Sequence, residues 1–373
     1  MGALAVALVP TAAGAGTPAW TIEPTPSPGV SYLTGVSCTA SSMCTAVGGY
    51  TAKRSPGLVE TWDGVRWVKG TAPEPPKATI SALSGVSCTG AMCMAVGLYY
   101  TLTNPGLTLA EVWNGAKWTV SPTPNPVGPE TDEFWGVSCP SATSCIAVGE
   151  TYSHSLVNKA LAETWNGVSW VIDPSARPAG TTSSDLTGVS CLSATDCTAV
   201  GFEGTSAGAG PLAERWNGTR WTVEPMATSS GITDGELEGV SCRSAKDCMA
   251  VGVDRIGSGT GTLAESWSGS IWTVEPPVNP AGAPLSWLSG VSCTSDKDCI
   301  AVGNDGTQVK IVTLAERWDG ASWTVEPTPN PLQTTKTKGS VLAAVSCSPG
   351  TVCTAVGDYQ VKKGTASLAE GRA

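Results

Sequence analysis

The sequence has one histidine, His154, among its 373 residues and only 2 phenylalanines. A single histidine cannot supply a zinc, copper or iron site that needs two or more histidine ligands. Lys and Arg total 21 against 31 acidic residues, and they form no basic run. Since nucleic-acid affinity depends on clustered Lys and Arg, the composition predicts no nucleic-acid partner.

Long hydrophobic runs are also missing. No stretch of about 18 apolar residues occurs, so the sequence predicts no transmembrane helix. Residues 1–16 contain a short apolar run followed by small residues, and they are similar to the later part of a secretory signal without its basic beginning. A signal remnant and an apolar tail are both open for this segment.

A repeated unit accounts for most of the chain. Gly-Val-Ser-Cys, or Ala-Val-Ser-Cys in the last copy, recurs at intervals of 50 to 54 residues. Each copy continues with a second cysteine and Ala-Val-Gly, a variable loop, a Leu-Ala-Glu-x-Trp segment and a strand led by a second Trp. Four runs rich in Val, Thr and Trp, bounded by Gly, Pro, Asn or Ser, predict four short strands, which we name a, b, c and d.

Seven units of this kind predict an all-β fold, a seven-bladed β-propeller with four antiparallel strands per blade. The last unit ends at Ala373 after its strand c, and the missing strand d stands at the other end of the chain as Trp20-Thr21-Ile22-Glu23. We therefore expect the N-terminal strand to close the last blade, so that residues 17–373 form one propeller. An open array would instead need polar caps.

Asn-Gly or Asp-Gly lies between strands c and d in five units, at residues 63–64, 114–115, 166–167, 217–218 and 319–320. Such pairs favour tight hairpin turns in which both turn residues have positive φ. In a two-residue or a four-residue loop, the two flanking Trp residues fall on one face and pack across the strands.

The cysteines occur as one local pair per unit, across the a–b connection. The pairs are Cys38 and Cys44, Cys88 and Cys93, Cys139 and Cys145, Cys191 and Cys197, Cys242 and Cys248, Cys293 and Cys299, Cys347 and Cys353. Paired hairpin strands bring such cysteines within disulfide range, which predicts one disulfide per blade and an exported, secreted or cell-surface protein. Free buried cysteines are the alternative. A metal site is not expected, because the pairs would be spread around the ring.

The unit resembles kelch repeats, in which a hydrophobic strand, a strand ending in Gly-Gly and two aromatic strands follow one another. Ala46-Val47-Gly48-Gly49 stands at the Gly-Gly strand, and Trp62 and Trp67 stand at the aromatic positions. The second glycine is replaced in the other units, and the cysteine pair is not a kelch feature. The Gly-x-x-Trp turn is also similar to the Asp-box of sialidase-like propellers, although Trp113 stands where that motif has Asp. These resemblances imply architecture rather than activity.

A residue that recurs in every unit is expected to be scaffold. The Glu of strand c recurs as Glu60, Glu111, Glu163, Glu214, Glu265, Glu316 and Glu370. We expect these carboxyls to be hydrogen-bond partners between strands or blades, and we expect the Trp pairs to be buried.

Candidate site residues lie where the units differ, at the start of strand a and on the face that carries the variable loops. Glu133, Asp185 and Glu236 come from three successive units and predict an acidic arc at the mouth of the channel, suited to a cation or a basic ligand. Tyr32, Trp135 and Trp287 are candidate aromatic platforms on the same rim. Solvated surface carboxylates and a hydrophobic cluster beneath the loops are the alternatives.

Three functions follow from this pattern. The first is a secreted, non-catalytic binding scaffold with a protein or glycan partner on the variable loop face. The second is a polysaccharide-acting enzyme, with Glu133, Asp185, Glu236 and Glu238 as its carboxylates. The third is a structural protein of a cell surface or coat layer. No catalytic residue and no cofactor is assigned.

Overall fold

The computed structural model describes residues 19–51, 55–126, 131–152, 157–178, 180–206, 208–226, 234–331, 339–348 and 352–372. Within these residues the chain forms strands, turns and bends, and no helix. The predicted all-β class is confirmed. The segment 1–16 and His154 lie outside the described residues.

Each repeat contributes strands in the order a, b, c, d. The a strands are β2 (Val30–Ala40), β6 (Ala78–Thr89), β10 (Thr131–Ser141), β14 (Thr181–Ser193), β18 (Glu236–Ser244), β22 (Leu285–Ser295) and β26 (Ser340–Ser348). The b strands are β3 (Met43–Thr51), β7 (Met92–Thr101), β11 (Ser144–Tyr152), β15 (Asp196–Thr205), β19 (Asp247–Ile256), β23 (Asp298–Thr307) and β27 (Val352–Val361).

The outer strands are shorter. The c strands are β4 (Gly57–Trp62), β8 (Leu107–Trp113), β12 (Asn158–Trp165), β16 (Gly208–Trp216), β20 (Gly259–Trp267), β24 (Lys310–Trp318) and β28 (Gly364–Arg372). The d strands are β5 (Trp67–Lys69), β9 (Trp118–Val120), β13 (Trp170–Ile172), β17 (Trp221–Val223), β21 (Trp272–Val274), β25 (Trp323–Glu326) and, from the N-terminal end, β1 (Trp20–Glu23).

The strands pair into five four-stranded sheets and one eight-stranded sheet. The eight-stranded sheet consists of two antiparallel repeats, β18–β21 and β22–β25, joined by one parallel pair between Thr260 and Leu285. In the last sheet β1 pairs with β28, so that Trp20 lies opposite Arg372. The two ends of the described chain are therefore held in one sheet.

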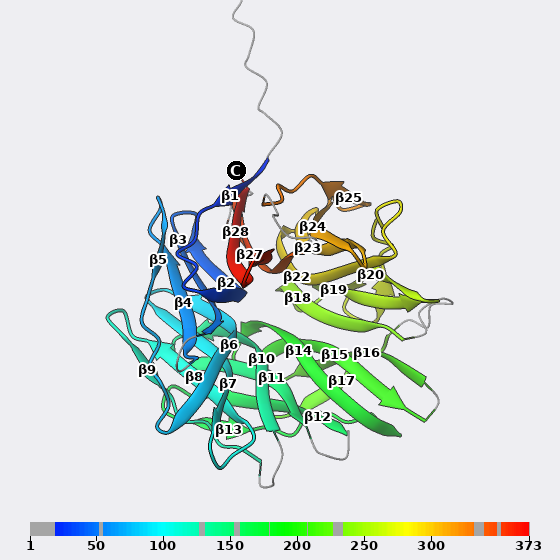
Figure 1. Ribbon diagram of the computed structural model, residues 1–373. Helices are drawn as coiled ribbons and strands as arrows, with labels where there is room; N and C mark the ends of the chain where they lie inside the picture. The colour runs from blue at the N-terminus through cyan, green and yellow to red at the C-terminus, as the bar shows by residue number, and fades with distance from the viewer. Residues whose placement is uncertain are drawn as a thin grey trace, which may run out of the picture.

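The sheets are arranged around a common centre, with the a strands innermost (Figure 1). Each a strand contacts the a strand of the next repeat, and β2 contacts both β6 and β26. This radial arrangement of antiparallel sheets is the β-propeller architecture.

The hydrophobic core lies between neighbouring sheets. One cluster joins Leu33, Leu58 and Trp67 of the first repeat to Val356 and Ala369 of the last. Equivalent clusters lie at the other junctions, because the alternating side chains of each strand face the sheets on either side. Burial between sheets is thus what holds successive repeats together.

The c–d turns differ from the prediction in one respect. Trp62 pairs directly with Trp67, which leaves a four-residue loop, and only Gly64 has a positive φ, of 92°. Asp63 instead accepts hydrogen bonds from the backbone N–H groups of Val65 and Arg66 through Oδ1. The expectation that both turn residues need positive φ is therefore wrong. The prediction for the Trp pairs is confirmed, since the Trp62 and Trp67 ring centroids lie 5.8 Å apart.

All seven predicted disulfides are present, from Cys38–Cys44 to Cys347–Cys353, and none of the described cysteines is free. In six pairs the cysteines are directly opposite each other, as Cys38 and Cys44 are, with Cα atoms 4.0 Å apart. Each bridge closes the turn between an a strand and its b strand. Such disulfide density is typical of proteins in an oxidising, extracellular environment.

The recurring Glu of strand c is buried at every repeat, but its role varies. Glu214 accepts hydrogen bonds from the Ser175 hydroxyl and the Ala176 backbone, and Glu316 accepts one from the Val278 backbone. Within the described residues, both carboxyl oxygens lack a partner in Glu60, Glu111, Glu163 and Glu370. The expected hydrogen-bonding role is correct for the first two and wrong for these four.

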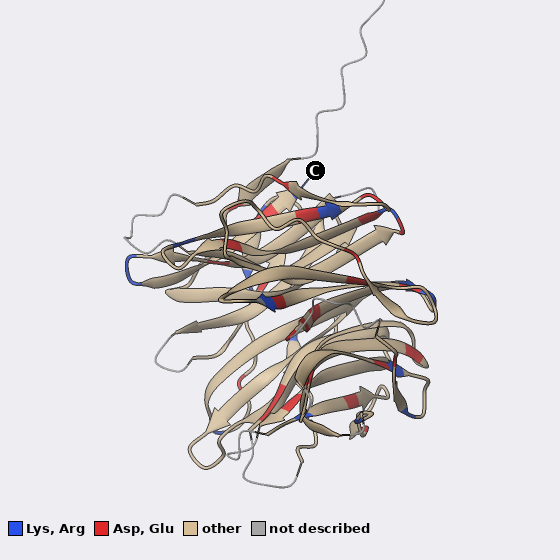
Figure 2. Cartoon of the chain, turned by 90° about the vertical axis from the view of Figure 1, so that its right-hand side faces the viewer, with Lys and Arg blue, Asp and Glu red and all other residues tan. Residues whose placement is uncertain are grey.

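Charged side chains are sparse over the whole molecule. Lys and Arg lie mainly at strand ends and in loops, whereas several Asp and Glu lie within the strands (Figure 2).

The described part of the chain contains no helix with the length and apolar character that crossing a membrane requires.

Candidate binding site at the channel mouth

The a strands surround a central cavity of about 520 Å³, to which all seven of them contribute lining residues. The glycine of the repeated Gly-Val-Ser-Cys motif lets neighbouring a strands approach closely. A Cβ on Gly35 would lie 3.1 Å from the Cα of Gly85, and one on Gly85 would lie 2.9 Å from the carbonyl oxygen of Trp135. Glycine is therefore needed here for close packing rather than for a turn.

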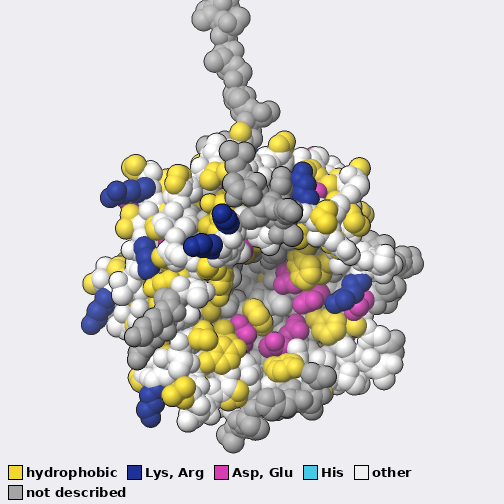
Figure 3. All heavy atoms as spheres, viewed as in Figure 1, with side chains coloured by type: hydrophobic (Ala, Val, Ile, Leu, Met, Phe, Trp, Pro, Cys, Tyr) yellow, Lys and Arg dark blue, Asp and Glu magenta, His cyan; other side chains and the backbone are white. Residues whose placement is uncertain are grey.

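Acidic side chains gather around one end of this cavity, with hydrophobic side chains beside them (Figure 3). We call this region the channel mouth and define it by five lining residues that share one side of the cavity. They are Trp135, Glu150, Asp185, Glu236 and Glu238. Two of the three predicted arc residues, Asp185 and Glu236, are among them.

The third arc residue, Glu133, lies beside the cavity rather than in its lining. It pairs in register with Glu150, which replaces the second glycine of the Gly-Gly motif in the third repeat. Burial, and then the charge of Glu150, raise the pKa of Glu133 to about 7. Glu150 was not predicted as a site residue, although its place directly after Ala-Val-Gly marked it as variable.

The channel-mouth carboxyls raise one another's pKa values. Burial, and then the charges of Glu236 and Glu150, raise the pKa of Asp185 to about 7. Burial, and then the charges of Glu236 and Asp185, raise the pKa of Glu238 to about 8. The buried oxygens Glu150 Oε2 and Asp185 Oδ1 have no hydrogen-bond partner among the described residues. The cluster therefore holds protons near neutral pH that isolated carboxyls would release.

One cation lies close to this cluster. Arg255 forms an ion pair with Asp234 at 3.0 Å, and its positive charge opposes the rise that burial causes in the pKa of Glu236. Among the channel-mouth carboxyls, Glu236 is therefore the one whose charged form is stabilised by Arg255. The remaining carboxyls of the mouth have no Lys or Arg partner in the described part of the chain.

The three predicted aromatic platforms differ in how they are placed relative to the cavity. Trp135 lines the cavity and is 40% exposed. Tyr32 is 36% exposed, and its ring lies across Gly49, where a Cβ would come within 2.6 Å of the Tyr32 hydroxyl. Trp287 is half-buried opposite Asn304 and does not line the cavity. Of the three, Trp135 is the one that lines the cavity with the mouth carboxyls. Tyr32 lies near Glu133, since burial and then the charge of Glu133 raise the pKa of the Tyr32 hydroxyl.

The described residues contain no group of three or more His, Cys, Asp or Glu side chains arranged to hold a metal ion. Chemically, the channel mouth offers carboxyl oxygens as hydrogen-bond acceptors and one exposed indole. It can accept a group that brings hydrogen-bond donors and an apolar surface.

Comparison with known proteins supports the fold. The structure is similar to YCF48 bound to a D1 peptide, at 13% identity and a TM-score of 0.53 over 94% of each chain. It is also similar to an ulvan lyase of polysaccharide lyase family PL25, at 9% identity and a TM-score of 0.58 over 88% of this chain and 90% of that one. No protein-family model matches the sequence, and no curated protein matches it either. At these identities the similarity shows a β-propeller fold alone.

Proposed function

We propose that this protein is a secreted, non-catalytic binding module, formed by residues 17–373 as one kelch-like propeller of seven blades that β1 closes. Its partner is a protein segment whose basic side chain enters the channel mouth. The observation that carries the proposal is the common cavity of Asp185, Glu236, Glu238 and Trp135. An ammonium or guanidinium group would supply donors to the buried oxygen of Asp185 and would lower the pKa of the surrounding carboxyls.

A glycan ligand is the second candidate, and Trp135 favours it. An indole that is 40% exposed inside a cavity offers a flat apolar face on which a sugar ring can stack. If the bound polysaccharide is also cleaved, Asp185 and Glu238 are the acid candidates, because their pKa values of about 7 and about 8 keep a proton available.

The deciding experiment measures binding of the oxidised protein to an oligolysine peptide and to a glycan array. Asp185→Asn combined with Glu238→Gln removes charge at the mouth, and Trp135→Ala removes the platform. Trp287→Ala is the matched control, because Trp287 does not line the cavity. Oligolysine binding that is lost in the carboxyl variant and retained in the control supports the proposal. Glycan binding lost only in Trp135→Ala supports the second candidate, and product release from that glycan marks it as a substrate.

If the protein binds neither ligand and self-associates as its concentration rises, the binding proposal is overturned and a structural protein of a surface or coat layer is favoured. Salt gives an additional test, since a basic partner held by exposed charges should bind less tightly as ionic strength rises. Binding that is insensitive to salt contradicts the basic-partner proposal.

A further inference from the structure

A second and larger cavity, of about 1070 Å³, lies at the junction of the first and second repeats. It opens beside the a–b and c–d turns, at the opposite end of β2 from Tyr32, and is therefore separate from the channel mouth. We call it the seam groove. Its walls include Met43, Trp62, Pro73, Trp113 and Trp118, together with the Cys88–Cys93 disulfide.

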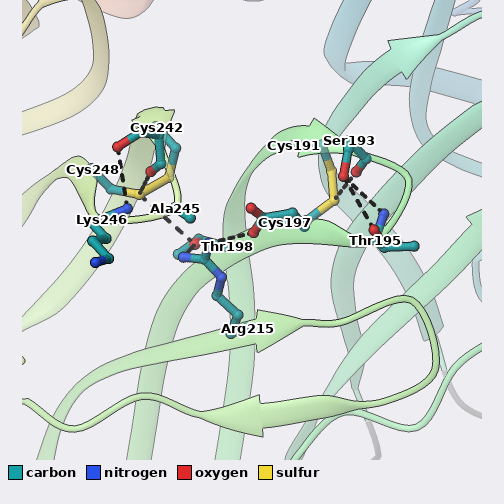
Figure 4. A network of polar contacts seen from close by, with 12 residues as sticks. Cys191, Ser193, Thr195, Cys197, Thr198, Arg215, Cys242, Ala245, Lys246 and Cys248 are labelled. Carbon is teal, nitrogen blue, oxygen red and sulfur yellow. Dashed lines mark hydrogen bonds and ion pairs between the residues drawn. A yellow bond between two sulfur atoms is a disulfide. The ribbon is translucent and has the colours of Figure 1, made fainter. Parts of the chain in front are cut away.

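At the corresponding junction between the fourth and fifth repeats, Arg215 and Thr198 lie in a network of polar contacts that reaches Cys248 (Figure 4). Arg215 forms an ion pair with Asp196 and donates a hydrogen bond to the Thr198 hydroxyl. Thr198 in turn contacts the sulfur of Cys248 in the next sheet. The long Arg215 side chain therefore occupies the space between the two sheets.

The first repeat has no such pair. Thr61 stands at the place of Arg215, and Met43 stands at the place of Asp196. In the fifth repeat an arginine from strand a extends into the junction instead. Arg243, directly after Cys242, pairs with Asp247 and reaches Cys299 in the next sheet. The equivalent residue of the first repeat is Thr39, directly after Cys38. Short side chains thus leave the seam groove open, and Met43 is 57% exposed at its edge. An exposed, adaptable Met is typical of binding surfaces.

The groove also holds two hydrogen-bond donors without partners. In the fourth, fifth and sixth repeats the indole N–H of the c-strand Trp donates to a carbonyl of its own a–b loop, at 3.1 to 3.2 Å. The half-buried indoles of Trp62 and Trp113 donate to no described residue, and their nitrogens are not among the buried unpartnered atoms, so both N–H groups are open to the groove. For Trp113 the a–b loop is one residue shorter, which removes the usual acceptor.

These walls define the chemistry of a ligand. The indole N–H can only donate, so the ligand must bring acceptors. Two of the acceptors in the walls are already used, because Asp63 Oδ1 accepts from the N–H groups of its own turn and the Ser37 hydroxyl accepts from Cys88 N–H. A proline-rich segment has apolar rings, free carbonyl oxygens and few N–H groups, and it is already extended in solution.

We propose that the seam groove binds a proline-rich peptide segment in the polyproline II conformation. Indoles of Trp62 and Trp113 donate to its carbonyl oxygens, and proline rings pack against Trp118 and Met43. This site does not depend on the proposed function of the channel mouth.

The test titrates the oxidised protein with decaproline and follows heat and tryptophan fluorescence, with a Gly-Ser peptide of equal length as the control ligand. Met43→Asp combined with Thr61→Arg copies the pair that the fourth repeat already accommodates, so the fold is expected to persist, and a thermal melt checks it. We expect this variant to lose decaproline affinity by about tenfold or more. Trp113→Phe keeps a ring without the N–H and should lose several-fold.

Trp135→Ala, at the channel mouth, should leave decaproline binding unchanged. The proposal is overturned if decaproline does not bind at millimolar concentration, if the filled variant binds it as tightly as the parent, or if the groove variants abolish binding of a glycan instead. A result of equal affinity for decaproline and the Gly-Ser peptide also overturns it, because the proline rings would then contribute nothing.

Discussion

The backbone N–H of Ala176 donates a hydrogen bond of 2.9 Å to Oε2 of Glu214. Ala176 belongs to the connector that follows β13, and Glu214 lies in β16 of the next repeat, so the bond joins neighbouring sheets. Val278 makes the same bond to Glu316 at 3.0 Å. The connector thus supplies a donor to a carboxyl group that is buried from solvent.

Proline explains why four equivalent carboxyls lack this bond. In the four connectors that precede the unpartnered glutamates, the position equivalent to Ala176 and Val278 is a proline. These prolines are Pro26 before Glu60, Pro73 before Glu111, Pro124 before Glu163 and Pro329 before Glu370. Proline has no backbone N–H, so these carboxyls receive no donor from the connector. Burial raises the pKa of Glu111 and Glu370 to about 8.

The first prediction concerns pH. In Glu111, Glu163 and Glu370 burial is the main cause of a pKa of about 8, against about 4.3 in an unfolded chain. The folded state therefore keeps protons that the unfolded state releases, and this stabilisation is complete below about pH 4 and lost as pH rises through about 8. We expect Tm to fall by roughly 5 °C or more between about pH 5 and pH 9. A Tm that is flat or rises over this range in calorimetry would contradict it.

The second prediction assigns the effect to a single residue. Glu111→Gln replaces a buried carboxyl with a neutral group of the same shape, so the free energy of unfolding at about pH 8.5 should rise by about 1 kcal/mol or more. At about pH 5 the change should be close to zero, because Glu111 is then already neutral. Glu214→Gln is the matched control and should be destabilising, since one acceptor oxygen becomes an NH₂ group facing a donor. Denaturant unfolding at the two pH values measures both.

The third prediction removes the donor instead. Four other connectors carry proline at the place of Ala176, so we expect Ala176→Pro to fit the backbone and to lose only the N–H. The expected cost is about 2 kcal/mol at about pH 8.5, where Glu214 is charged, because a hydrogen bond to a charged group is lost. It should shrink at about pH 5, since the pKa of Glu214 is about 7. An equal cost at both pH values would mean that backbone strain, and not the hydrogen bond, is responsible.

The sequence predicted the features that repeat. Strand order, the disulfides and the facing Trp pairs follow from spacing within one unit, because local pairing fixes them. What the sequence did not reveal depends on contacts between units. Glu150 lies opposite Glu133 within the third repeat, so that pair could have been found from the register of strands a and b. That Trp135 lines the cavity and Trp287 does not depends on how neighbouring sheets pack. The seam groove was also missed, because Thr61 and Met43 stand out only once Arg215 and Asp196 are known to fill the same space.

The fourth prediction concerns the pairing of the two chain ends. Arg372 is 1% exposed and forms an ion pair with Glu326 at 2.8 Å, while Trp20 donates its indole N–H to the same carboxylate at 3.1 Å. Arg372→Ala leaves the carboxylate without its cation, so we expect a loss of about 3 kcal/mol. Because Arg372 lies opposite Trp20, the loss should first appear as faster hydrogen exchange in β1. Arg220→Ala, at an exposed turn, is the control and should change neither quantity. If β1 exchanges at the parent rate in Arg372→Ala, the contact of Arg372 with Glu326 does not hold the N-terminal strand in place.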